Sequence, residues 1–594
     1  MDYVSDIVLS YPKLQERFRD KPNERVKALK HLNEIKAEYS KTYIKAFEKM
    51  LDVALPQIYD GINFNENDVN VKELVKNSCI VFVPNHQSHA DYLAMNYMVF
   101  KEYGIPLYVA GGKNLNIFPI GKLFRKSGCF FIRRSFQNNI LYKLVLEGYL
   151  YYLLMEKLPI EFFFEGGRSR TGKLLPPRYG LYHMLLEAHR ALPESKKSPL
   201  TFIPVSINHE YVPEQQSLVK ENRGAKKTKE HTMQLFGLLG LFSHQFGSIH
   251  INLGTPVIAK APLDPRDLKS ATQKLAFNCF LEVGRNMVVT PSSLLAFILL
   301  DSPEGAFRWD EIRSRAIIIL DYCRNFDVPL TSSLSAENRD ESLQRALDIF
   351  IGNKKVQVIG SPENGPSFYS IKKEARSELL YFKNSILHHF LVPWGITSAW
   401  LSLFSGEIEN VRDLQEFFLE RRNQLKHEFY LPSTKEFLLK TLKTISQIIG
   451  RDVKRLDDCL KLSHKDLYQI ASHLGVFSRS MNSIFEGYFL SALTMKKMLS
   501  VSTHGFKRDE YIKGYGETFE QEKKLGRVVK YPESYSVVMA KSALNYFEHA
   551  GFIEVRDGNY FGTDKKLLSD ACSHFEDVLH KTLGLNLVPP VEEG

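Results

Sequence analysis

A histidine and an aspartate five residues apart, His86 and Asp91, are the pair in this sequence best suited to acid–base chemistry. They follow the apolar run at residues 80–83, which its β-branched and aromatic side chains predict to be a strand. Five positions on a regular helix would separate the side chains by roughly 140°, so they can meet only if His86 lies in a turn and Asp91 in the first helical turn. The carboxylate would then accept one imidazole N–H and leave the other nitrogen free to take a proton from a hydroxyl group.

The same residues have a simpler structural explanation. Ser88 and Asp91 have the Ser-x-x-acid spacing of a capping box, in which side chains bond the free amides at a helix N-terminus. His86 would then be a surface histidine in a turn. Because capping boxes are common, the neighbouring polar stretches must decide between the two interpretations.

A second polar stretch, residues 165–173, follows directly after another predicted strand at residues 160–164. Adjacent glycines let a backbone approach a ligand closely, and cationic side chains suit a phosphate. The stretch supplies both: Gly166, Gly167, Arg168, Arg170 and Lys173. Its spacing is not that of a P-loop, so the prediction is an anion site of another kind.

A third stretch, residues 104–135, carries six basic side chains and no acidic one. Arg133 ends the predicted strand 129–133 and Arg134 follows it. Extended backbone directs the two side chains to opposite sides, so at most one faces a given site. The preferred explanation for the other four is a solvated surface: Lys113, Lys122, Arg125 and Lys126.

These stretches lie in a region where short β-rich runs alternate with longer helical segments. The runs are residues 80–83, 107–110, 129–133, 160–164, 201–206 and 250–253. The alternation predicts an α/β fold, with a sheet covered by helices. Ligands of such sheets bind beyond the carboxyl ends of strands, which is where His86 and the 165–173 stretch fall.

The length of 594 residues is too great for one ordinary core, and a chain with 44% hydrophobic and 25% charged residues is globular. We expect three parts: an N-terminal helical region over residues 1–60, an α/β domain over 61–290 and a mostly helical C-terminal domain over 291–594. The clearest C-terminal helices are predicted at residues 379–390, 411–429 and 434–449.

Two places in the C-terminal domain predict a helix followed by a hairpin, at residues 344–359 and 540–561, with Asp557-Gly558 as a turn. Such units resemble pieces of winged helices. No dense basic helix accompanies either unit, so we do not expect a nucleic-acid partner.

The six cysteines are scattered, without CxxC pairs or histidines at metal-ligand spacing, which favours reduced thiols, a cytoplasmic compartment and no metal site. The N-terminus lacks the basic and apolar regions of a signal peptide, and no run of about 18 apolar residues is present. We therefore expect any contact with a membrane to be peripheral.

Four blocks of this sequence together resemble the glycerol-3-phosphate acyltransferases, and most of all the bacterial membrane-associated enzymes, to which the dihydroxyacetone phosphate acyltransferases are related. In chain order they are Asn85-His86-Gln-Ser-His-Ala-Asp91, Gly128-Cys-Phe-Phe-Ile-Arg-Arg134, Phe164-Glu165-Gly-Gly-Arg168-Ser-Arg-Thr-Gly172 and Phe202-Ile-Pro204-Val-Ser206. The first block is shared by all glycerolipid acyltransferases, whereas the third is more specific to enzymes acting on glycerol phosphate.

The resemblance implies transfer of a fatty acyl group from an acyl thioester to the 1-hydroxyl of sn-glycerol-3-phosphate, the first step of phospholipid synthesis. His86 backed by Asp91 would be the general base. Arg134 is chosen over Arg133 because it matches the last arginine of the second block. Glu165 would accept a hydroxyl of the acceptor or neutralise an arginine. The implied substrate-binding residues are Arg134, Glu165, Gly166, Gly167, Arg168, Ser169, Arg170 and Pro204.

The implied partners are glycerol-3-phosphate, a lipid surface, and acyl-CoA or acyl-carrier protein as co-substrate, with no separate cofactor. The implied location is the cytoplasmic face of the bacterial cell membrane, where residues 235–246 beside the basic 220–229 segment would supply contact. Two alternatives stay open: an acyltransferase for dihydroxyacetone phosphate or lysophosphatidic acid, and a non-catalytic membrane scaffold. The larger relatives extend well beyond this chain.

Overall fold

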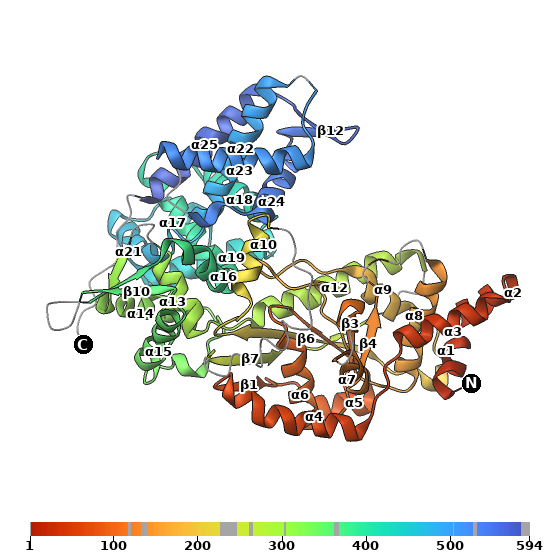
Figure 1. Ribbon diagram of the computed structural model, residues 1–594. Helices are drawn as coiled ribbons and strands as arrows, with labels where there is room; N and C mark the ends of the chain where they lie inside the picture. The colour runs from red at the N-terminus through yellow and green to blue at the C-terminus, as the bar shows by residue number, and fades with distance from the viewer. Residues whose placement is uncertain are drawn as a thin grey trace. The chain divides into compact units, whose positions relative to one another are not determined.

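The computed structural model describes residues 2–116, 120–133, 135, 139–225, 246–260, 265–301, 305–360, 367–429, 431–502, 504–526 and 532–583. They form two compact units, which we describe separately (Figure 1). The first unit takes its described residues from 1–169, 175–213 and 228–288, and the second from 170–174, 214–227 and 289–594. Nothing in the sequence indicated that two short segments of the α/β region belong to the second unit. The three-part division at residues 60 and 290 stays a prediction.

A sheet of eight strands forms the centre of the first unit, in the order β1-β7-β6-β2-β5-β3-β4 with β8 paired to β6. The strands are β1 (Gly61–Asn65), β2 (Cys79–Pro84), β3 (Tyr108–Gly112), β4 (Cys129–Ile132), β5 (Ile160–Glu161), β6 (Leu200–His209), β7 (Ser248–Leu253) and β8 (Val257–Ile258). Strands β2 to β6 pair in parallel, whereas β7 and β8 run antiparallel to β6. The predicted α/β fold is confirmed, although β5 is shorter than expected.

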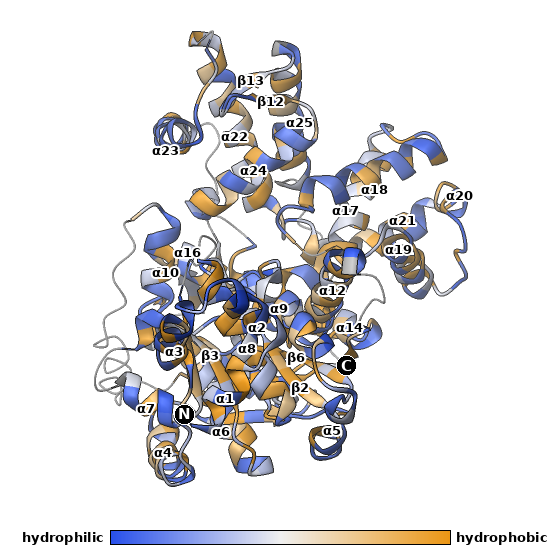
Figure 2. Cartoon of the chain, turned by 90° about the vertical axis from the view of Figure 1, so that its right-hand side faces the viewer, coloured by the Kyte–Doolittle hydropathy of each residue, from blue (hydrophilic) through white to orange (hydrophobic). Residues whose placement is uncertain are grey.

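The two central strands β2 and β6 are buried along their whole length. A strand covered on both faces is selected for a continuous apolar run, which is why residues 80–83 are recognisable in the sequence. Figure 2 shows hydrophobic residues concentrated on these strands. Helices lie on both sides of the sheet (Figure 1). They are α8 (Ile140–Met155), α9 (Tyr179–Arg190) and α12 (Leu268–Asn286) on one side, and α4 (Lys41–Ala54), α5 (Val71–Asn77) and α6 (Asp91–Tyr103) on the other.

The N-terminal helices α1 (Tyr3–Leu9), α2 (Pro12–Asp20) and α3 (Glu24–Ile35) pack against α8. Basic residues hold the end of α3 in place. Arg125, at the end of α7 (Ile120–Lys126), was expected on a solvated surface but is buried and donates to the carbonyl oxygens of Glu34 and Lys36. The last carbonyls of a helix have no intrahelical partners, so a guanidinium there satisfies them. Lys113 and Arg133 bind the Glu34 carboxylate at 3.0 and 2.7 Å.

The second unit is mostly helical. Its helices outside the two repeats described next are α10 (Gln215–Asn222), α16 (Arg376–Ile386), α17 (Leu391–Phe404), α18 (Val411–Leu425), α19 (Thr434–Ile449), α20 (Leu456–Cys459), α21 (His464–Leu474) and α25 (Lys565–Leu583). The predicted helices at residues 379–390, 411–429 and 434–449 overlap α16, α18 and α19. Among the described residues, no helix combines the length and hydropathy needed to cross a bilayer.

One arrangement occurs twice in the second unit: a helix, a short extended segment, two helices and a hairpin. The first copy is α13 (Pro291–Leu299), β9 (Ala306–Arg308), α14 (Trp309–Asn325), α15 (Arg339–Gly352), β10 (Val356–Ile359) and β11 (Phe368–Ile371). The second copy is α22 (Asn482–Val501), the bridge residue Phe506, α23 (Arg508–Leu525), α24 (Val537–His549), β12 (Ile553–Arg556) and β13 (Asn559–Gly562). Both predicted helix–hairpin units are confirmed, each within a winged-helix order of elements.

The two copies agree in detail. In each, the extended segment pairs antiparallel with the last strand through a buried phenylalanine, Phe307 or Phe506. The residue that turns the chain from the third helix to the hairpin has positive φ in both, 59° at Lys354 and 77° at Gly551. The third helices bury matching side chains: Leu343, Ala346, Leu347 and Phe350 on α15, and Ala540, Ala543, Leu544 and Phe547 on α24. The second unit therefore contains an internal duplication.

Candidate active site

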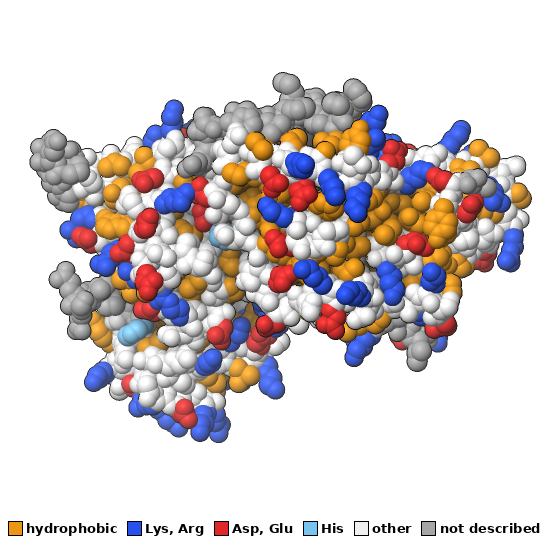
Figure 3. Space-filling model, turned by 90° about the horizontal axis from the view of Figure 1, so that it is seen from below, with side chains coloured by type: hydrophobic (Ala, Val, Ile, Leu, Met, Phe, Trp, Pro, Cys, Tyr) orange, Lys and Arg blue, Asp and Glu red, His pale blue; other side chains and the backbone are white. Residues whose placement is uncertain are grey.

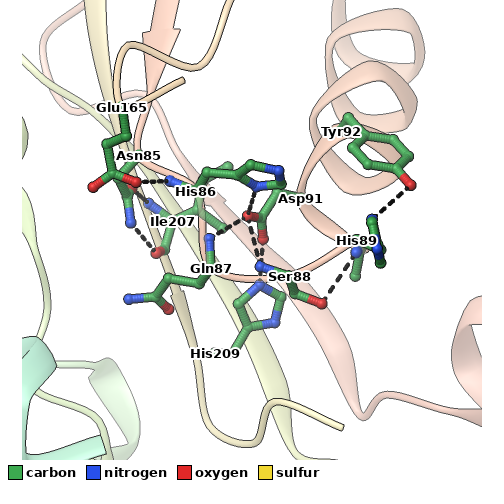
Figure 4. Close-up of polar contacts among 11 residues, drawn as sticks. Asn85, His86, Gln87, Ser88, His89, Asp91, Tyr92, Glu165, Ile207 and His209 are labelled. Carbon is green, nitrogen blue, oxygen red and sulfur yellow. Dashed lines mark hydrogen bonds and ion pairs between the residues drawn. The ribbon is translucent and has the colours of Figure 1, made fainter. Parts of the chain in front are cut away.

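His86 and Asp91 meet at the carboxyl end of β2. His86 lies in the turn after the strand, Asp91 is the first residue of α6, and His86 Nδ1 is 2.8 Å from Asp91 Oδ2 (Figure 4). This is the arrangement that their spacing required. The strand ends and the helix begins within a few residues, so a short local segment suffices to build the contact.

Asp91 also closes the turn. Its Oδ2 accepts the amide N–H of Gln87 at 2.7 Å and that of Ser88 at 2.9 Å. The same carboxylate therefore contacts the imidazole and closes the turn that precedes α6. The expected capping box is not formed, because α6 begins at Asp91 and its N-cap residue is Ala90, which has no capping side chain. The two backbone amides thus hold Oδ2, the oxygen that faces the imidazole, in place.

Asn85 ties this turn to the neighbouring strand. Its Nδ2 donates to the Ile207 carbonyl at 3.0 Å, and its Oδ1 accepts the Ile207 amide at 2.7 Å. The side chain thus takes the place of a strand partner and extends the pairing of β2 with β6 by one step. The register of β6 relative to the His86 turn follows from this contact.

Sequence analysis missed His209, the last residue of β6. Its Nε2 lies 2.6 Å from Asp91 Oδ1, and both side chains are completely buried. Two imidazoles therefore share one carboxylate, one through each oxygen (Figure 4). No spacing rule links residues so far apart in the chain; the one available clue was that His209 continues the strand of the fourth block.

The Asp91 carboxylate is ionised. Burial by itself would raise its pKa, but hydrogen bonds from His209 and His86 outweigh burial and hold the pKa well below the usual range. An ionised carboxylate only accepts, so the facing nitrogens of both rings must carry hydrogen. His86 then has its lone pair on Nε2, and its ring is 13% exposed and lies against Phe163 with centroids 4.2 Å apart.

The third block holds the peptide units on both sides of His86. Glu165 accepts the His86 amide at 3.0 Å and the Leu175 amide at 2.8 Å, and the Ser169 amide donates to the His86 carbonyl at 2.8 Å. Burial raises the pKa of Glu165 to about 8, against the opposing effect of these two amides. The structure thus brings Glu165 and Ser169 to the His86 backbone.

Gly166 and Gly167 of the third block differ in whether their backbone is open to a ligand. The Gly166 amide donates to the Phe163 carbonyl at 3.0 Å, and Gly166 has a φ of 69°, so this amide is committed to the turn. A Cβ on Gly167 would meet nothing within 4 Å, so the backbone there borders open space. Arg168 is half-buried beside it, and Pro204 is buried in β6 opposite Val83. Arg134 lies outside the described residues.

The remaining cations of this stretch belong to the second unit. Arg170 binds Glu221 with Nε 2.8 Å from Oε2, and Lys173 forms a buried ion pair with Glu428. Among the described residues, no three His, Cys, Asp or Glu side chains are grouped to hold a metal ion. The chemistry that the described groups support is removal of a proton by His86 next to an opening at Gly167.

Comparisons with known proteins point in one direction. A family model described as Acyltransferase matches residues 66–208, and one described as Glycerol-3-phosphate acyltransferase C-terminal region matches residues 218–556, more than half of the chain. Similar curated proteins carry the name glycerol-3-phosphate acyltransferase. That of Haemophilus ducreyi is 27% identical over 498 residues, which cover 81% of this chain and 60% of the relative. That of Pseudomonas entomophila is 31% identical over 63% of this chain and 46% of the relative. That of Shewanella woodyi is also 31% identical, over 63% of this chain and 47% of the relative. The chain thus spans about half the length of these relatives.

Proposed function

Since this chain belongs to the glycerol-3-phosphate acyltransferase family, we propose that it is a glycerol-3-phosphate 1-O-acyltransferase. It transfers a fatty acyl group from an acyl thioester to the 1-hydroxyl of sn-glycerol-3-phosphate and releases lysophosphatidic acid and a free thiol. The observation that carries the proposal is the contact of 2.8 Å between His86 and Asp91 at the end of β2. A hydroxyl is a poor nucleophile until its proton is removed, and this pair is built to remove it.

The reaction uses His86 twice. Its Nε2 takes the proton of the 1-hydroxyl as the oxygen attacks the thioester carbonyl, and the resulting imidazolium is stabilised by Asp91. When the tetrahedral intermediate collapses, the carbon–sulfur bond breaks and the leaving sulfur receives the proton from His86. Glu165 and Ser169 keep the His86 peptide in place through its amide and carbonyl during both transfers.

The acceptor phosphate needs cationic donors near the same opening. Arg134 and Arg168 are the proposed donors, because guanidinium groups bind phosphate oxygens in a bidentate manner. The free space at Gly167 supports close approach of a ligand to the backbone, and Pro204 on β6 is a further proposed substrate-binding residue. Acyl-CoA or acyl-carrier protein is the donor, and the reaction calls for no further cofactor.

The protein acts at the cytoplasmic face of the cell membrane as a peripheral protein, because its product is a lipid. The segment first expected to supply contact, residues 235–246, lies almost entirely outside the described residues. Support comes from α4, which exposes Tyr43, Met50 and Val53 beside Lys45 and Lys49. Figure 3 views the protein from below, the side of Figure 1 on which α4 lies, and shows hydrophobic side chains exposed among both basic and acidic ones.

One assay tests the proposed function. Purified protein is incubated with palmitoyl-CoA and glycerol-3-phosphate, with dihydroxyacetone phosphate or lysophosphatidic acid replacing the acceptor in parallel reactions. We expect thiol release and lysophosphatidic acid formation with glycerol-3-phosphate, and much slower reactions with the others. Faster turnover of another acceptor would assign that substrate instead. Binding to anionic vesicles without turnover of any acceptor would identify a scaffold.

A further inference from the structure

A second histidine on the Asp91 carboxylate is not needed for general-base catalysis, since one carboxylate suffices to orient one imidazole. His209 nevertheless comes from a different strand, lies fully buried, and forms the shorter of the two histidine contacts, 2.6 Å against 2.8 Å for His86. We propose that His209 is a positioning residue, which holds the Asp91 carboxylate in line with the His86 ring and limits the negative charge that Asp91 presents to His86. This proposal rests on the proposed function.

The two oxygens of the Asp91 carboxylate have different hydrogen-bond partners. Asp91 Oδ2 serves the His86 ring and the amides of Gln87 and Ser88, all within one turn. Its Oδ1 faces the other way and meets His209. The local turn alone therefore fixes one oxygen, and His209 is the contact that fixes rotation of the carboxylate about its last bond. A carboxylate held at both oxygens keeps one geometry with the imidazole.

The two ring nitrogens of His209 also differ in their hydrogen bonds. Its Nε2 donates to Asp91, whereas its Nδ1 has no hydrogen-bond partner in the part of the chain that the structure describes. A buried imidazolium would leave an N–H of that nitrogen unpaired, which costs free energy, so His209 is neutral. A neutral N–H donor draws electron density from the carboxylate without adding a competing positive charge next to His86.

Other ionisable groups around this array are few. The Tyr59 ring centroid lies 6.4 Å from that of His209, and Glu161 and Glu165 interact electrostatically with Asp91. Burial raises the pKa of both glutamates, so neither carries a full charge at neutral pH. The adjacent Glu210 is occupied by the Ser248 amide and by His250. His209 is thus the neighbour outside the turn that directly bonds Asp91.

Substitution of His209 tests this role through the titration of His86. His209→Phe keeps a ring but removes the N–H, so Asp91 presents more charge to His86 and raises its pKa. We expect the acidic limb of the pH profile of kcat/KM to move upward by about 0.5–1 unit. With the carboxylate free to rotate, kcat should fall about 10-fold. His209→Gln places an amide N–H where Nε2 lies and should restore both values.

The chain offers a matched control. His250 lies on β7, is 8% exposed, and bonds Glu210 with Nε2 3.2 Å from Oε1, outside the His86 array. His250→Phe likewise removes the N–H of a largely buried imidazole from a carboxylate and should leave the His86 titration unchanged. If His209→Phe melts early, His209→Asn replaces it, because the shorter amide mimics Nδ1 and loses the contact with Asp91.

The readout must separate this proposal from the proposed function. Nuclear magnetic resonance titration of ¹⁵N-histidine-labelled protein reports the His86 pKa whether or not the protein is an acyltransferase. An unshifted His86 titration in folded His209→Phe, or an equal shift in His209→Gln, would overturn the positioning role. Absence of wild-type turnover would instead remove the proposed function while the titration still decides the role of His209.

Discussion

The carboxyl groups around the His86 turn differ in their partners from four carboxylates of the second unit. These four pair with cations: Glu533 with Arg376, Glu428 with Lys173, Asp301 with Arg315, and the half-buried Glu378 with Lys355. In the first unit, the three buried carboxyl groups around the His86 turn have no Arg or Lys partner among the described contacts. Asp91 is shared by two histidines, Glu165 accepts two amides, and neither oxygen of Glu161 has a hydrogen-bond partner among the described residues.

Ion-paired carboxylates and carboxyl groups without a cationic partner suit different roles, the first structural and the second chemical. A carboxylate in a buried ion pair keeps a constant charge and a fixed partner, so it can hold helices together but cannot exchange protons at neutral pH. A carboxyl group without a cation has its pKa set by burial and by neutral donors, and so responds to its surroundings. The carboxyl groups around the His86 turn are therefore available for proton chemistry, whereas the ion-paired carboxylates of the second unit have a structural role.

The largest effect is expected at His86 itself. His86→Ala should lower kcat about 10²–10⁴-fold, because general-base catalysis is lost, with little change in KM for glycerol-3-phosphate. Steady-state kinetics at several acceptor concentrations measures both constants. His183→Ala, a half-buried histidine on α9, serves as the control and should keep wild-type turnover. Substantial turnover by folded His86→Ala would return this turn to a purely structural role.

In the second unit, Glu533→Gln should destabilise the fold by about 3–5 kcal/mol, because it leaves the Arg376 guanidinium buried without its charge partner. The two groups are each 3% exposed and bonded at 3.0 and 3.1 Å. All three tryptophans, Trp309, Trp394 and Trp400, lie in this unit, so their fluorescence during urea unfolding reports on it selectively.

A double variant provides the comparison for that experiment. Replacing Arg376 and Glu533 together by leucine removes both charges, and stability should recover most of the loss seen in Glu533→Gln. Equal instability of the single and double variants would show that shape, and not charge pairing, governs this contact.

A pH effect of intermediate size is expected from Glu165. Its pKa of about 8 in the folded protein exceeds the ordinary 4.5, so its stabilising contribution is full below pH 4.5 and is lost as the pH rises through 8. The wild type should therefore lose about 3–4 kcal/mol more than Glu165→Gln between pH 5 and 8.5. Scanning calorimetry across this range measures the difference, and parallel curves for the two proteins would falsify the raised pKa.

The smallest effect is expected at Glu161, the matched carboxyl-to-amide change in the first unit. Burial raises the pKa of Glu161 well above its ordinary value, so the group is neutral at pH 7 and the amide of Glu161→Gln has the same charge and nearly the same shape. Stability at pH 7 should change by less than about 1 kcal/mol. A loss as large as that of Glu533→Gln would mean that the two units do not differ in the way described.

Much of this protein is determined locally by its sequence. The apolar run of β2 predicts a buried strand because a strand covered on both faces needs one, and the spacing of His86 and Asp91 predicts their contact because a turn and one helical turn define it. The hairpin turn at Asp557-Gly558, with φ of 50° and 78°, follows from a short-range rule of the same kind.

Other features were decided only by the tertiary structure. His209 reaches Asp91 because β6 pairs with β2 in a register that Asn85 extends, and no local pattern encodes the order or register of strands. Arg125 is buried because the end of α3 packs beside it, although its own segment looks like a solvated surface. Short-range periodicity reports which face of an element is apolar, whereas the partner that covers that face, or that a charged side chain meets, depends on segments far along the chain.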